Sequence, residues 1–295
     1  MLDWYAAEIV RRQTANLINQ LHIMLENTLA PVELFALIDE WRERGTTLPP
    51  PAAHWLGGVD TLLRGGGQPV QPYERRMINK SATVFAAPGT EAERSGRTVV
   101  VAFTGTAHRL MMPIALFLQQ CPADRYEFLI LRDFRRSLYL RGIEGFGSDF
   151  PETLERIRTL IPAPSDRRVI SLGISAGGLA AIWATVELGL PRAVSVCGVT
   201  PDEIGARVQT RGMSAPGFDE AVHRNAGRLP EVLLVSGEQN ARDNRRAQSM
   251  AGRLPATLIS VPDCAYHNVL HALWSRGELR PFLARLMEPG PESRG

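Results

Sequence analysis

The stretch that constrains this chain most is 169–180, where an apolar run leads into a serine framed by glycines. Residues 173–177 read Gly-Ile-Ser-Ala-Gly and fit the G-x-S-x-G pattern of a sharp turn from a strand into a helix. Such a turn holds the serine in a strained backbone conformation with its hydroxyl pointing outward, and the flanking glycines remove the Cβ atoms that would block it. The pattern therefore predicts that Ser175 is a nucleophile at the end of a buried strand.

The sequence on either side of this turn supports the prediction. Residues 168–172 are typical of a buried strand, and residues 179–188 are typical of a helix that stops at Gly189. The alternatives are a glycine-rich turn without chemistry and a phosphate-binding loop. Neither G-K-[S/T] nor G-x-G-x-x-G completes a phosphate-binding signature at this turn, which favours the nucleophile.

With this turn, the chain resembles the α/β-hydrolase superfamily, specifically its serine esterase and lipase-like branch. The resemblance covers about residues 81–287, which is an ordinary size for one domain. It implies an α/β-hydrolase fold and a catalytic triad in the chain order serine, acid, histidine. The alternating strands and helices independently predict an α/β fold with a mostly parallel central sheet and helices on both faces.

The resemblance implies that the base of the triad follows the last strand of the sheet. Residues 257–261 are typical of that strand, and the loop after it leads to His267. A lone histidine is usually a structural residue, but the serine turn already present makes His267 the strongest of the six histidines for this role.

The acid is expected after the strand predicted over 232–236. Relatives commonly carry it three residues after the glycine equivalent to Gly237, but in this chain that residue is Asn240. Asp243 lies one helical turn further along and is our candidate for the acid, with Glu238 as the alternative. Asp243 could also be a helix-terminal carboxylate that the helix dipole favours.

The resemblance also implies an oxyanion hole. The loop 104–107 follows a predicted buried strand, and by resemblance its Thr106 backbone N–H is one donor while Ala176, directly after the serine, supplies the other. The alternative is a plain loop after a strand. His108 and Arg109 lie beside it and are either substrate contacts or solvated loop residues.

These residues imply acyl transfer through an acyl-enzyme on Ser175, a chemistry that requires neither a metal nor an organic cofactor. The expected partner is a small-molecule acyl ester or thioester that the chain hydrolyses as a carboxylesterase or thioesterase. An acyltransferase would use the same triad, and Asn240 is the feature that favours a non-catalytic, hydrolase-like binding protein. Three arginines could bind an anionic group of the substrate or form a solvated face, namely Arg135, Arg136 and Arg141.

Composition restricts the classes of partner. The formal net charge of +2 gives no case for nucleic acid or for an anionic membrane surface. No apolar run approaches the about 20 residues of a transmembrane helix, and charged residues occupy the N-terminus, so we expect a cytoplasmic protein. The three cysteines are too few and too scattered for a disulfide framework or a zinc site.

The chain is expected to divide at about residue 72. Residues 1–72 form a helical N-terminal extension that caps the site, packs on the sheet edge or joins subunits of a homo-oligomer. Residues 73–288 form the catalytic domain, with 199–229 as a possible lid, and 289–295 form a flexible tail. The helices expected in the extension are 1–29, 33–44 and 54–63; the first strand of the domain is expected at 81–87, and its last helix at 269–287.

Overall fold

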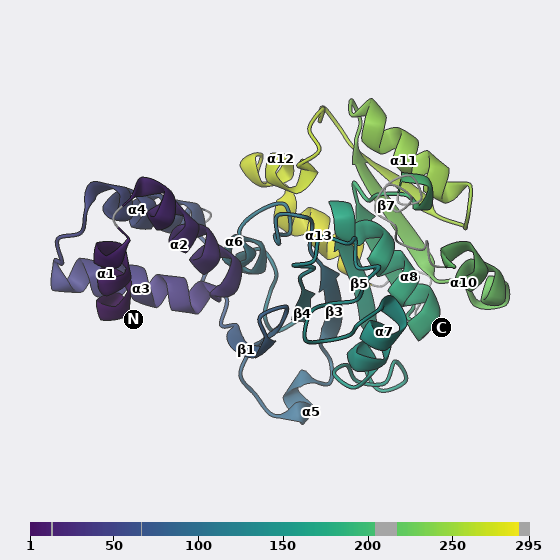
Figure 1. The fold of residues 1–295 in the computed structure, drawn as a ribbon, viewed down its shortest axis with the longest axis horizontal. Coiled ribbons are helices and arrows are strands. Elements are labelled where there is room, and N and C mark those ends of the chain that lie inside the picture. Colours follow the sequence, from purple (N-terminus) through teal and green to yellow (C-terminus); the bar gives the residue numbers. More distant parts are fainter. Residues whose placement is uncertain (13, 66, 204–216, 289–295) are drawn as a thin grey trace.

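The computed structural model describes residues 1–12, 14–65, 67–203 and 217–288. Its centre is an eight-stranded sheet with the order β1-β2-β4-β3-β5-β6-β7-β8 (Figure 1). The strands are β1 (Glu74–Asn79), β2 (Ala82–Ala86), β3 (Thr98–Phe103), β4 (Tyr126–Leu131), β5 (Val169–Ile174), β6 (Arg192–Val196), β7 (Glu231–Gly237) and β8 (Thr257–Val261). β2 pairs antiparallel with both of its neighbours, whereas β3 to β8 pair in parallel. The mostly parallel central sheet of an α/β fold, expected from the sequence, is confirmed.

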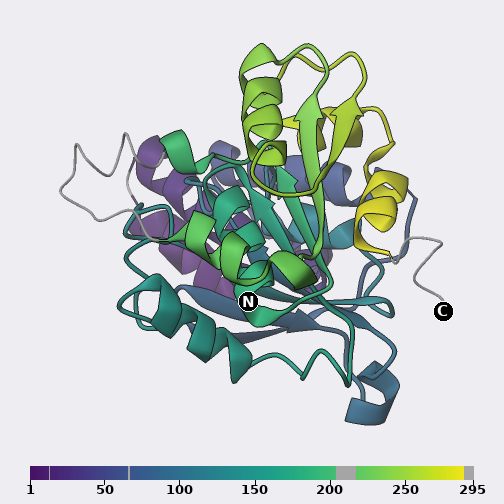
Figure 2. The ribbon, with the colours of Figure 1, turned by 90° about the vertical axis from the view of Figure 1, so that its right-hand side faces the viewer.

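Helices cover both faces of this sheet. They are α5 (Glu91–Arg94), α6 (Ile114–Gln119), α7 (Phe150–Arg158), α8 (Gly178–Leu188), α10 (Phe218–Arg224), α11 (Ala241–Ala251), α12 (Val269–Ser275) and α13 (Leu279–Met287). Side chains of β3 alternate between two cores, because successive residues of a strand point to opposite faces. One core contains residues of α7, α8, α10 and α11, and the other contains residues of α6, α12 and α13. Figure 2 shows the sheet between the green and the yellow helices.

The N-terminal extension consists of four helices, α1 (Leu2–Arg11), α2 (Ala15–Thr28), α3 (Pro31–Arg44) and α4 (Pro50–Arg64). The prediction of one helix over 1–29 is wrong, because the Thr14 hydroxyl caps a new helix by accepting from the Leu17 N–H. α4 begins four residues earlier than predicted. Pro50 and Pro51 are its first residues, where the N–H that proline lacks would have no helical partner.

The four helices pack on the rest of the molecule through α6, which α2, α3 and α4 contact beside the sheet (Figure 1). Inside the extension, the Tyr5 hydroxyl and His22 Nε2 are 2.9 Å apart, and the Trp55 ring stacks on the His22 ring at 4.2 Å. Burial lowers the pKa of His22 to about 4, so this histidine is neutral at pH 7. Glu26 lies 3.7 Å from Arg109, which joins the extension to the loop after β3. The role of the N-terminal extension as a cap or as an oligomerisation surface stays a prediction.

Two further elements differ from the sequence-based expectation. The strand β1 precedes the one predicted first and was missed because its residues, Glu-Arg-Arg-Met-Ile-Asn, lack apolar alternation, as suits an edge strand. The helix predicted over 269–287 is two helices, because Gly277 between them has a φ of 74°. Within the predicted lid, α10 packs against α8 with the Phe218 and Trp183 ring centroids 6.2 Å apart. Residues 204–216 of that lid and the predicted tail 289–295 lie outside the described residues.

None of the described helices combines the length and the hydropathy that crossing a membrane requires.

Candidate active site

The turn after β5 has the strained geometry that its sequence predicts. Ser175 has a φ of 51°, in the left-handed region that a residue with a side chain rarely adopts. A methyl group on Gly173 would lie 2.7 Å from Cβ of Ala181, and one on Gly177 would lie 2.7 Å from the carbonyl carbon of Phe103. Only glycine fits at these two positions, because the turn around Ser175 packs closely against β3 and α8.

A chain of hydrogen bonds leads from Ser175 into the protein. The Ser175 Oγ lies 2.9 Å from His267 Nε2, and His267 Nδ1 lies 2.8 Å from Asp243 Oδ2. Because a carboxylate only accepts hydrogen bonds, Nδ1 carries the proton and Nε2 accepts from the serine hydroxyl. This is the arrangement in which a histidine can take the serine proton.

The acid in this arrangement comes from a helix rather than from the end of a strand. Asn240 is the N-cap of α11, and its Oδ1 accepts from the Asp243 N–H at 3.1 Å. Asp243 therefore lies in the first turn of α11, where the positive end of the helix dipole favours a carboxylate. The alternative acid, Glu238, instead accepts from the Asp263 N–H at 3.1 Å. The structure brings Asp243, and not Glu238, to His267.

Two opposing effects act on Asp243, whose side chain is only 1% exposed. Burial raises the pKa of this carboxyl, but hydrogen bonds and charges from His267 and Arg246 lower it by a larger amount. The net pKa is therefore below its usual range. The Arg246 contact is a hydrogen bond of 2.9 Å from Nη1 to Asp243 Oδ1. Asp243 is therefore ionised at neutral pH.

Thr106 and Ala176, the two predicted oxyanion donors, line the same pocket as Ser175 and His267, with a volume of about 370 Å³. The loop that carries Thr106 is fixed at Thr104, whose carbonyl accepts from the Tyr139 hydroxyl at 2.9 Å. The same loop passes against the serine turn, since a methyl group on Gly105 would lie 3.6 Å from the Ser175 Cβ. The loop and the turn are thus adjacent, as an oxyanion hole requires, and the donor roles stay predictions.

Other candidate substrate contacts lie elsewhere. His108 packs on Phe134 with ring centroids 4.4 Å apart, and Arg109 pairs with Glu26 of the extension. Arg135 donates to the carbonyl of Arg141. The described lining of the triad pocket includes none of the residues predicted to contact substrate or bind an anion, namely His108, Arg109, Arg135, Arg136 and Arg141.

Two other arginines line this pocket instead. Arg242 is 63% exposed, and Arg246 is 8% exposed. The signal that could have identified Arg246 is its spacing, because residues three apart on a helix are neighbours and Asp243 and Arg246 have opposite charges.

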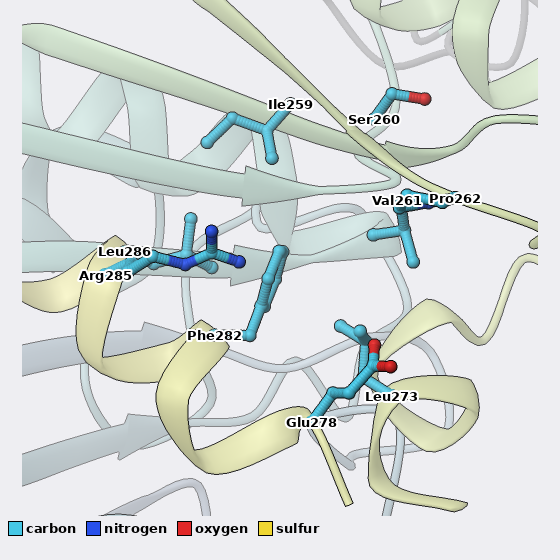
Figure 3. A pocket seen from close by; sticks show the side chains of 9 residues that line it. All are labelled: Ile259, Ser260, Val261, Pro262, Leu273, Glu278, Phe282, Arg285 and Leu286. Carbon is cyan, nitrogen blue, oxygen red and sulfur yellow. The ribbon is translucent and has the colours of Figure 1, made fainter. Parts of the chain in front are cut away.

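A larger pocket of about 450 Å³ lies between β8, α12 and α13 (Figure 3). Phe282 lies between Arg285 and Glu278 in this view, and most other lining side chains are apolar. The described residues of its lining include Ser260 but no histidine that could activate it. The smaller pocket, in contrast, is lined by Ser175 together with His267 and Asp243.

The described residues offer one cluster with the composition of a metal site, which overlaps the triad. Ligand atoms of Cys197, Asp243 and His267 lie within 4.8 Å of one another. Burial raises the pKa of the Cys197 thiol, which keeps it protonated, whereas a metal would need the thiolate. The carboxylate and imidazole already bind each other, and Arg246 adds a positive charge. This cluster does not fit a metal ion.

No family model matches the chain, and no curated protein matches it. Solved structures do match: Est1E from Butyrivibrio proteoclasticus is 11% identical, with 73% of this chain and 99% of that chain covered and a TM-score of 0.47. An esterase from the bacterial hormone-sensitive lipase family is 17% identical, with 88% and 100% covered and a TM-score of 0.47. A dienelactone hydrolase from Anabaena variabilis is 16% identical, with 74% and 100% covered and a TM-score of 0.44.

Proposed function

We propose that the protein is a serine hydrolase that cleaves a carboxylic ester or thioester through an acyl-enzyme on Ser175. The observation that carries this proposal is the unbroken hydrogen-bonded chain Ser175–His267–Asp243, with distances of 2.9 and 2.8 Å. A serine hydroxyl is a poor nucleophile until an oriented base takes its proton. These hydrogen bonds supply Ser175 with both a base and the carboxylate that orients it.

The reaction begins when Ser175 Oγ attacks the substrate carbonyl while His267 Nε2 takes its proton. The oxyanion of the tetrahedral intermediate accepts from the backbone N–H groups of Thr106 and Ala176. His267 then gives the proton to the leaving alcohol or thiol, and the acyl group stays on Ser175. Water, deprotonated by the same histidine, releases the acid, while Asp243 stabilises each imidazolium that forms.

The lining of the pocket points to a short acyl group. Of the lining residues that the structure describes, Ala176 and Val199 are the apolar ones, whereas Asn240, Arg242 and Arg246 are polar or charged. A long hydrocarbon chain would bury little of its surface against such a lining.

We expect turnover of acetyl and butyryl esters to exceed that of octanoyl esters. The experiment measures hydrolysis of oxygen esters and thioesters that share the same acyl groups, with a Ser175→Ala preparation as the blank. Faster cleavage of the thioester series would define a thioesterase, and faster cleavage of the ester series a carboxylesterase. Turnover at the level of the blank for every substrate would contradict the proposal and favour a hydrolase-like binding protein.

Acyl transfer to an acceptor other than water uses the same residues and is decided by product analysis. We expect the free acid as the main product when alcohols, amines or thiols are added to the assay. A new ester, amide or thioester as the main product would instead define an acyltransferase.

A further inference from the structure

Behind His267 lies a row of three charged side chains that alternate in sign. Asp243 is followed by Arg246, and Arg246 by Glu203. Arg246 uses all three of its nitrogens in this row: Nη1 donates to Asp243 Oδ1 at 2.9 Å, Nε donates to Glu203 Oε1 at 3.0 Å, and Nη2 lies 2.8 Å from Glu203 Oε2. Arg246 is 8% exposed and Glu203 30%. Because the Arg246 guanidinium is buried, its charge interacts strongly with its neighbours.

Arg246 fixes the direction of the acid. The Asp243 carboxylate has two oxygens, and with Oδ1 bound by Arg246 the other, Oδ2, faces His267 Nδ1. Asp243 and Arg246 are both on α11, three residues apart, so their relative position is set by the helix. The guanidinium is a rigid planar fork and therefore holds both carboxylates in one geometry.

The same row also acts on the charge of His267. The imidazolium that forms during the reaction is favoured by the negative charge of Asp243 and disfavoured by the positive charge of Arg246. Glu203 binds Arg246 from the far side and offsets part of that positive charge. The charges of Arg246 and Glu203 therefore act on the imidazolium in opposite directions.

Other titratable or charged groups surround the triad on the elements packed against it. The Cys197 thiol at the end of β6 lies beside Asp243 and is neutral. Arg242 is largely exposed and lies 3.6 Å from Glu203, and Glu238 is bound to the Asp263 N–H. Cys264 is buried, whereas Tyr266 and His271 are exposed. Among the described residues, Arg246 is the charged group in contact with Asp243 on the side away from His267.

We propose that Arg246 and Glu203 are positioning residues that act through Asp243, Arg246 by orienting the carboxylate and the pair together by setting the basicity of His267. This inference rests on the proposed function, because it concerns the base of that reaction. This inference predicts that substitutions of Arg246 and Glu203 shift the pH dependence in opposite directions, which a purely structural role would not predict.

The test compares the dependence of kcat/KM on pH in Arg246→Met and Glu203→Gln, using the ester that the wild type cleaves best. The acid limb of this profile reports the protonation of His267 in the free enzyme. Arg246→Met removes a positive charge, which favours the imidazolium, so the limb moves to higher pH. Glu203→Gln removes a negative charge, so the limb moves to lower pH. Each shift is expected to be about half a pH unit or more.

Arg246→Lys separates charge from orientation. The ammonium keeps the positive charge, so the acid limb stays near that of the wild type. One ammonium cannot reproduce the fork that joins Asp243 to Glu203, so kcat/KM at the optimum falls, by about tenfold.

Two matched controls lie close by. Arg253 follows α11 and pairs with Asp202 and Asp219, and none of its described ion pairs involves Asp243 or His267. Arg253→Met and Asp202→Asn change the same kinds of charge as the test variants, next to the same helix. We expect both to leave the acid limb where it is in the wild type.

A second readout does not depend on turnover, namely titration of the His267 ring by NMR in histidine-labelled protein. Opposite shifts in Arg246→Met and Glu203→Gln support the inference. Shifts in the same direction in the two variants, or no shift in folded variants, overturn it. If Arg246→Met does not fold, the shift in Glu203→Gln decides, since the inference predicts a move to lower pH. An inactive wild type whose His267 still titrates in this way would contradict the proposed function but not the electrostatic coupling.

Discussion

Asp243→Asn is expected to lower kcat/KM for ester hydrolysis by about 10³- to 10⁴-fold while leaving the fold intact, because the orienting carboxylate is lost. The substitution keeps the shape of the side chain. Arg246 donates to Oδ1, so the amide oxygen of the asparagine will face Arg246 and its NH₂ group will face His267 Nδ1. Nδ1 must then accept, which places the ring proton on Nε2, and Nε2 can no longer take the proton of Ser175.

The matched control for this variant is Glu238→Gln. Glu238 was the alternative acid in the sequence, and its carboxylate accepts from the Asp263 N–H at 3.1 Å rather than from His267. We expect it to change kcat/KM only a few-fold. The assignment of the acid would be refuted by the reverse result, a severe loss in Glu238→Gln together with near wild-type turnover in Asp243→Asn.

Gly177→Ala is expected to reduce the free energy of unfolding by about 3 kcal/mol or more, or to prevent folding. The added methyl group would lie 2.7 Å from the carbonyl carbon of Phe103 and nearer still to its oxygen. Phe103 ends β3, which is hydrogen-bonded on both sides in the middle of the sheet, so this backbone cannot move away at low cost. Chemical denaturation measures the change.

The control for this variant is Gly58→Ala on α4. A methyl group at Gly58 would meet nothing within 4 Å, and the residue is exposed inside a helix. Alanine there is expected to raise stability by about 0.5–1 kcal/mol, because glycine loses more conformational freedom on folding. A folded Gly177→Ala variant as stable as the wild type would mean that the turn does not need glycine at this position.

Much of this fold could be predicted from the sequence because its central strands are nearly continuous apolar runs. β3, β4 and β5 are buried on both faces, and the strand predicted over 168–172 lies within two residues of the bounds of β5. The serine turn could be predicted equally well, because its glycines are required sterically by the turn itself. The sequence also pointed to the three residues that lie within hydrogen-bonding distance, although their roles stay predictions.

What could not be predicted depended on contacts between distant segments. β1 is a polar edge strand that exists because β2 pairs with it, and its sequence carries no strand signal. Asp243 could not be distinguished from Glu238, because the choice depends on how α11 packs beside the loop that carries His267. Glu203 is 43 residues from Arg246 in the chain, and only the folded structure brings them together.

The central claim is that Ser175 is an activated nucleophile. The most direct measurement is intact-mass detection of a fluorophosphonate adduct on the wild type and on Ser175→Ala, followed by peptide mapping. We expect one adduct per wild-type chain, mapped to Ser175, and none on the variant, because only an activated serine displaces the fluoride. A folded wild-type protein that acquires no adduct, or an adduct that persists on Ser175→Ala, would contradict the claim.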